Sequence, residues 1–152
     1  MFPIIAFNPL KGHNNSNPKA DVVLNFYEQA TLVEDENDNS LIVKASAGGV
    51  SCLYMGDAGH LVENRLMLHN CDLKADILKV GHHGSSDATG QEFIKSVGPK
   101  YAVISVGANQ YDHPSDEVIA RLQKTNVQLY RTDVCSKITF YATEKQWEVM
   151  VD

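Results

Sequence analysis

Basic residues are scarce in this chain. Lys and Arg number 13 against 19 Asp and Glu among 152 residues, which gives a formal net charge of -6 at pH 7. Because affinity for a phosphate backbone comes from clustered Lys and Arg, this balance argues against a general polyanion-binding protein. Any contact with nucleic acid must therefore be local.

Cysteine is also rare, and its spacing points to no cross-link. Cys52, Cys71 and Cys135 are odd in number, far apart and form no C-x-x-C pair. The sequence therefore predicts neither a disulfide framework nor a thiolate zinc site. A chain of this length buries roughly two-thirds of its unfolded surface, so a single domain over residues 1–152 is stable without either.

Long apolar runs are absent as well. No stretch approaches the roughly twenty apolar residues of a membrane-spanning helix. The apolar N-terminal segment carries no leading basic residue and meets Asn8-Pro9 too early for a signal peptide. We expect a cytoplasmic location by default, and the sequence leaves open whether a longer parent is a membrane protein.

Strand and helix patterns alternate regularly from Ser40 onward, which predicts an α/β (α+β) fold. Thr89 and Glu92 have the spacing of a capping box, and Ser115 precedes two acidic residues as a helix N-cap does. The expected elements are a short first strand, a hairpin over 41–55 that turns at Gly48-Gly49, a helix over about 58–69, a strand over 77–80, a helix from Thr89 that Pro99 ends, a strand over 101–106, a helix after Ser115, a strand over 127–131 and a hairpin over 138–151.

Polar side chains capable of chemistry follow three of these predicted strands. Asp57 follows the strand that ends at Met55, His82-His83 follow the strand over 77–80, and His113 lies after the strand over 101–106. If the three strands are parallel neighbours, their carboxyl ends meet at one edge of the sheet, where α/β folds build sites. Asp and His are ligands that suit zinc and related ions.

Each of these residues also has a purely structural interpretation. Asp57 can cap the next helix, and His113 before Pro114 can be a turn residue. His82-His83 are poor strand formers between two glycines, which favours a site more strongly. His13, His60 and His69 lie in a turn-rich loop or on a polar helix, and Glu34–Asp38 lacks calcium-loop spacing, so we assign all of these to solvated surface.

Four segments carry a further signal: Glu36–Val43, Tyr54–Asp57, Leu78–Ser85 and Tyr111–Ser115. Together they resemble the metallo-β-lactamase superfamily, and more narrowly the metallohydrolase domain of the ComEC type found in DNA-uptake competence proteins. Their order, spacing and intervening strands agree with that family from about Asn39 to Thr132.

The resemblance implies the C-terminal half of an αββα sandwich with a site for one or two zinc or manganese ions that activate water. It implies that Asp57 bridges the metal ions and takes part in catalysis, that His82 or His83 is a further ligand, and that His113 binds or protonates the scissile group. Ser85 and Ser115 of the same motifs are implied to contact substrate. The implied substrate is a phosphodiester, DNA in the ComEC branch.

The chain also departs from the family pattern. The principal metal motif, His-x-His-x-Asp-His, is absent, Asp112 stands where a glycine is usual, and Ser136-Lys137 stand where Gly-Thr is expected. Half of the sandwich would leave an apolar sheet face bare, so we expect a missing N-terminal half or a second copy of the chain to cover it. Two alternatives stay open: a non-catalytic half-domain that binds partners, and a metallohydrolase of small esters or nucleotides.

Overall fold

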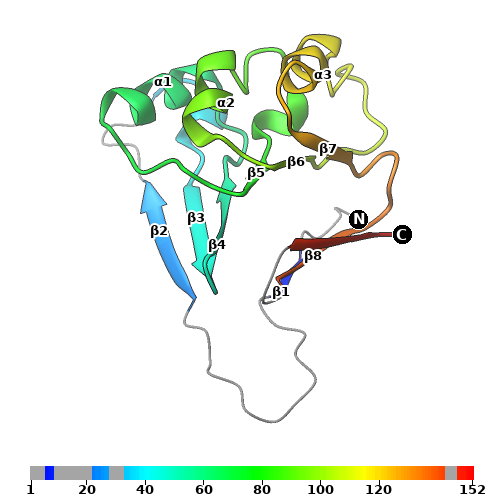
Figure 1. Cartoon of the computed structure of the whole chain (residues 1–152). Coiled ribbons are helices and arrows are strands. Elements are labelled where there is room, and N and C mark those ends of the chain that lie inside the picture. Colours follow the sequence, from blue (N-terminus) through cyan, green and yellow to red (C-terminus); the bar gives the residue numbers. More distant parts are fainter. Residues whose placement is uncertain (1–5, 9–21, 28–32, 143–146) are drawn as a thin grey trace.

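A computed structural model of the chain describes residues 6–8, 22–27, 33–142 and 147–152. The described chain forms three layers: three helices lie on one face of a six-stranded sheet, and a second, three-stranded sheet packs against the opposite face (Figure 1). The α/β class that we predicted is confirmed. The loop expected over residues 11–21, with His13, lies outside the described residues.

The large sheet brings the predicted strand ends to one edge. Its order is β2 (Val23–Tyr27), β3 (Ile42–Ala47), β4 (Val50–Tyr54), β5 (Ile77–Lys79), β6 (Tyr101–Ile104) and β7 (Gln128–Arg131). Strands β2 to β4 are antiparallel, and β4 to β7 are parallel. Tyr54 is level with Lys79, which is level with Val103. The loops after β4, β5 and β6 therefore start side by side.

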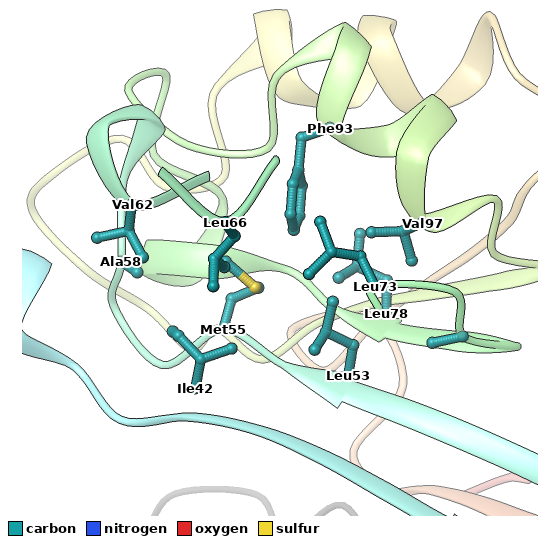
Figure 2. Close-up of a cluster of buried hydrophobic side chains, with 11 residues drawn as sticks. Ile42, Leu53, Met55, Ala58, Val62, Leu66, Leu73, Leu78, Phe93 and Val97 are labelled. Atoms are coloured by element: carbon teal, nitrogen blue, oxygen red, sulfur yellow. The ribbon is translucent and has the colours of Figure 1, made fainter. Parts of the chain in front are cut away.

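Helix α1 (His60–Leu68) and helix α2 (Gln91–Val97) cover β3 to β5, and α3 (Asp116–Gln123) covers β6 and β7. Figure 2 shows Phe93 of α2 and Leu66 of α1 pointing at the side chains of the sheet. Burying one such side chain stabilises the fold by roughly 1.5–3 kcal/mol. The members of this cluster are Ile42, Leu53, Met55, Ala58, Val62, Leu66, Leu73, Ala75, Leu78, Phe93 and Val97.

The start of α2 differs from the sequence prediction. Thr89 and Glu92 do not form a capping box: the N-cap is Gly90, it makes no side-chain cap bond, and Thr89 has a left-handed φ of 57°. The buried carboxylate of Glu63, on α1, accepts the backbone N–H groups of Thr89 and Gly90 instead. At the other end Gly98 is the left-handed C-cap, so the helix has already ended before Pro99.

The small sheet confirms the predicted terminal hairpin. Strand β8 (Ile138–Ala142) pairs antiparallel with β9 (Trp147–Val151) and parallel with β1 (Ala6–Asn8), while the turn over 143–146 lies outside the described residues. Ile138 and Phe140 pack on Cys52, Ile77 and Val103 of the large sheet.

This sheet covers only part of the face that we expected to be bare. It packs on residues from β4 to β7, whereas Leu24 and Phe26 of the edge strand β2, which point to the same face, are about half exposed. The chain's own small sheet thus covers much of the face that we expected to be bare, and apolar side chains stay exposed on it at β2. Among the described residues, no helix is long and apolar enough to cross a membrane.

Candidate active site

Asp57, His82, His83 and His113 lie together at the carboxyl edge of β4, β5 and β6. The imidazole Nε2 of His83 is 3.2 Å from Oδ1 of Asp57. The rings of His82 and His113 meet edge-on with centroids 5.6 Å apart. The parallel register therefore brings together the residues that the sequence predicted, from segments up to 56 residues apart in numbering.

The ring of His83 is held in one orientation. Its Nδ1 is 2.6 Å from the backbone carbonyl oxygen of Ser105. Because a carbonyl oxygen can only accept, Nδ1 must carry the proton, and Nε2 is turned toward Asp57. A second hydrogen bond of this kind is what usually orients a metal-binding histidine. Of the two neighbouring histidines, His83 is thus the one beside Asp57.

His82 has a different partner. Its Nδ1 is 3.3 Å from Oδ1 of Asp87. Burial alone would raise the pKa of the Asp87 carboxyl, but hydrogen bonding by the Ser85 side chain and the nearby His82 lower it below its ordinary value. Asp87 is therefore ionised at neutral pH. The pattern of strand ends does not reveal Asp87, because this residue follows no predicted strand.

The backbone at the two histidines is strained. His82 and His83 have φ of 44° and 51°, in the left-handed region that costs a residue with a Cβ about 1–2 kcal/mol. The glycines on either side permit this turn, because a Cβ on Gly81 would lie 2.6 Å from the carbonyl oxygen of Ala58. Strain of this kind clusters at functional sites, where surrounding structure maintains it.

Polar side chains from distant segments hold the loop that carries Asp57. The N–H of Asp57 donates to Oγ of Ser40 at 2.9 Å, and the N–H of Gly59 donates to Oδ1 of Asp38 at 2.8 Å. Nζ of Lys79 donates to the carbonyl of Gly56 at 2.9 Å, and burial lowers the pKa of that amine. The site is therefore supported by residues that no pattern of strand ends would reveal.

The contacts of this loop correct two interpretations made from the sequence, one of Glu34–Asp38 and one of Asp57. The segment Glu34–Asp38 is not wholly solvated, because Asp38 bonds to Gly59. Asp57 is not the cap of α1 either, because the N-cap is Gly59 and it receives no side-chain cap bond. Of the helix histidines, His69 is exposed as predicted. His60 is only partly exposed, and its Nε2 is buried without a hydrogen-bond partner among the residues that the structure describes.

His113 stands on the wall of a shallow cleft of about 690 Å³. Burial lowers its pKa from the ordinary value, and the neighbouring His82 and His83 lower it further. The cleft carries charges of both signs, and its lining includes Ser86, Asp112, His113, Ser115, Glu117 and Arg131. An anionic ligand would meet His113 and Arg131 there, and also several carboxylates.

The two serines of the motifs have structural partners. Oγ of Ser115 accepts the N–H of Val118 at 3.3 Å, which confirms it as the N-cap of α3, and the residue also lines the cleft. Ser85 is 8% exposed and its hydroxyl bonds to the Asp87 carboxylate. That either serine contacts substrate stays a prediction.

Replacing Ser115 with alanine is expected to lower the free energy of unfolding by about 1 kcal/mol, the usual cost of a lost N-cap. Urea unfolding followed by circular dichroism measures this. Ser115→Asp keeps a capping oxygen and is the matched control, so equal losses in both variants would contradict the capping role.

The donor atoms fit part of a metal shell. Oδ1 of Asp57 and Nε2 of His83 are as close as two ligands of one zinc ion, whose bonds of about 2.0–2.2 Å meet at tetrahedral angles. Within the described part of the chain, however, no three His, Cys, Asp or Glu side chains are grouped so as to hold an ion. The pair falls short of the three or four protein ligands that zinc sites normally have.

The fold and the site define a mixed α/β protein with a His and Asp cluster at the carboxyl edge of parallel strands. No family model matches the chain. Among curated proteins, ComE operon protein 3 of Bacillus subtilis is 42% identical over 99 residues, which are 64% of this chain and 13% of that protein. Competence protein ComA of Neisseria gonorrhoeae is 35% identical over 108 residues, which are 70% of this chain and 16% of that protein.

A third relative is recombination protein 2 of Haemophilus influenzae, 31% identical over 104 residues that cover 68% of this chain and 13% of that protein. The homologues of this chain thus include competence proteins. The chain spans only 13% to 16% of the length of these relatives.

Proposed function

We propose that this chain is part of a metal-dependent phosphodiester hydrolase that acts in competence, with DNA as its substrate. The names of the relatives support the role in competence. The observation that carries the chemistry is the pairing of Asp57 with His83, next to the facing rings of His82 and His113.

Asp57 and His83 would hold a zinc or manganese ion in this proposal, and His82 lies where it could serve a second ion. A bound ion of this kind lowers the pKa of a water molecule toward about 7 and neutralises charge at phosphorus. Ser105 and Ser40 orient the pair, through the ring of His83 and the backbone of Asp57 respectively.

His113 would act at the substrate. Its ring lies on the wall of the cleft and faces His82, so it can reach a group bound beside the pair of ligands. An imidazole carries at least one N–H in either protonation state, so it can donate a hydrogen bond to a phosphate oxygen. Arg131 lies on the same wall, but its guanidinium is paired with the carboxylate of Asp133, so its attraction for that phosphate is weakened.

The remaining ligands would come from another segment. We propose a missing N-terminal half, or else a second copy of the chain, placed against the apolar edge strand β2. Val23, Leu24 and Phe26 are about half exposed there, and an uncovered apolar edge favours pairing with another strand.

Metal binding tests this proposal. Adding Mn²⁺ to the ¹⁵N-labelled chain is expected to broaden amide signals around Asp57 and His83 first, because the ion is paramagnetic. Loss of a residue that only orients a metal ligand typically weakens metal binding by about 10- to 100-fold. Asp57→Ala and His83→Ala each remove a proposed ligand itself, so each is expected to weaken Mn²⁺ binding by at least this much. His69→Ala removes an exposed histidine at the end of α1, outside the cluster, and is the control.

Equal Mn²⁺ affinity in the wild type, Asp57→Ala, His83→Ala and His69→Ala would refute the site. Hydrolysis of the 4-nitrophenyl ester of thymidine 5′-monophosphate, with Mn²⁺ or Zn²⁺ present, separates the alternatives. Turnover that depends on Asp57 supports the hydrolase, whereas metal binding without turnover favours the non-catalytic half-domain. The carboxylates of Asp112, Asp116 and Glu117 in the cleft favour the third candidate, a hydrolase of small esters or nucleotides.

A further inference from the structure

We propose that Tyr111 is the surface on which an unpaired nucleobase of the substrate stacks. This inference rests on the proposed function and adds a residue that determines specificity. The side chain of Tyr111 belongs to none of the hydrophobic clusters of the described chain, and the residue is 69% exposed. A large aromatic ring that contributes so little to packing is available for a ligand.

The ring of Tyr111 lies beside the site. Its centroid is 6.0 Å from that of His113, and the two ring planes are tilted by 31°. His113 in turn faces His82 at 5.6 Å. A base stacked on Tyr111 would therefore place its own phosphodiester within the reach of His113 and of the cleft.

Asn109 fixes the segment that presents Tyr111. Its Oδ1 accepts the N–H of Tyr111 at 2.9 Å and the N–H of His113 at 3.1 Å. Its Nδ2 donates to the carbonyls of Gly107 at 2.9 Å and of His113 at 2.8 Å. The Asn109 side chain thus holds the backbone at both Tyr111 and His113, so a ligand need not order this loop when it binds.

The charges of the cleft favour a ligand contact that does not depend on charge. Asp112, Asp116 and Glu117 line the cleft, and the guanidinium of Arg131 forms two hydrogen bonds to the carboxylate of Asp133. Attraction of a phosphate backbone is weak in such surroundings. Stacking of a base on an aromatic ring does not depend on net charge and is tolerant of base identity.

Two matched ligands and two variants test this role. The first ligand is a single-stranded tetramer of deoxythymidine, and the second is an abasic tetramer with the same phosphodiesters. Both are titrated into the ¹⁵N-labelled chain and followed by NMR. We expect the thymidine tetramer to bind more tightly, and Tyr111→Leu to weaken its binding by about tenfold without changing that of the abasic tetramer. Tyr111→Phe keeps the ring and should bind both ligands as the wild type does.

The outcomes separate this inference from the proposed function. If both tetramers bind equally and Tyr111→Leu changes neither affinity, stacking on Tyr111 is wrong, while binding of phosphodiesters stands. If the wild type binds neither tetramer, the proposed function and the stacking role both fail. Unchanged amide spectra of the free variants show that the fold is intact, as expected for an exposed side chain.

Discussion

Replacing Gly84 with alanine is expected to lower the free energy of unfolding by roughly 2–5 kcal/mol and to displace His113 from His82. Gly84 has φ of 85°, which costs a residue with a Cβ about 1–2 kcal/mol. The new Cβ would also lie 2.6 Å from Cβ of Pro114, and such overpacking costs about 1–3 kcal/mol. Pro114 directly follows His113, so a shift of Pro114 would also move the ring of His113 relative to that of His82.

Gly49→Ala is the matched control for this prediction. Gly49 has φ of 81°, close to that of Gly84, but a Cβ there would meet no atom within 4 Å. Urea unfolding of both variants separates the backbone cost from the overlap with Pro114. The NMR shifts of the His82 and His113 rings should change in Gly84→Ala alone. If both variants lose the same free energy of unfolding, the added Cβ at Gly84 displaces Pro114 without an energetic penalty, and the predicted overlap is wrong.

Replacing Glu63 with leucine is expected to lower the free energy of unfolding by roughly 2–6 kcal/mol. Glu63 is 1% exposed, and its carboxylate accepts the backbone N–H groups of Thr89 and Gly90. Leucine fills the space but accepts no hydrogen bond, and each buried N–H left without a partner costs about 1–3 kcal/mol. Thermal or urea unfolding measures the loss. Glu92→Leu, on the exposed side of α2, is the control and should change stability little.

The same carboxylate should make stability depend on pH. Burial raises the pKa of Glu63 above its ordinary value, although hydrogen bonds from Gly90 and Thr89, and the nearby His60 and Arg121, oppose this. The folded state then holds the proton more tightly than the unfolded state, so this contribution to stability is present below the unfolded pKa and is lost as pH rises through the folded pKa.

Glu63→Gln carries no titrating group at this position. The stability of the wild type relative to Glu63→Gln should therefore fall as pH increases from about 4 toward neutrality. Urea unfolding of both proteins across that range measures the difference. A difference that grows with pH would mean that the hydrogen bonds outweigh burial and that the pKa is in fact lowered.

The sequence predicts five of the six strands of the large sheet, β3 to β7, because their apolar runs are strong, but it does not predict the edge strand β2, whose region is weakly patterned. The prediction that Asp57, His82-His83 and His113 share one edge depends on parallel strands, and the register of β4 to β6 satisfies this condition. Strand ends are visible in a sequence because an apolar run stops there. The residues that come after each strand end can therefore be compared with one another from the sequence alone.

The supporting contacts could not be predicted in the same way. The N–H groups before α2 bind Glu63, a residue 26 positions earlier, so no local capping pattern describes that helix start. The choice of His83 over His82 beside Asp57 depends on a turn with two positive φ angles and on the carbonyl of Ser105. Such long-range contacts leave no periodic signal in the chain.

Because β4 to β6 are parallel, their carboxyl ends lie on one side of the large sheet and their amino ends on the other. We expect substitutions and insertions to be tolerated better at the amino ends. All of the site lies at the carboxyl ends of β4 to β6, while the opposite ends are joined by the turn at Gly48-Gly49 and by the segments before Ile77 and Tyr101. A side chain added at Gly48 or Gly49 meets open space. A label, tag or inserted loop at that turn would thus be remote from the histidines, and gene fusions that leave the His and Asp cluster unchanged are best made there.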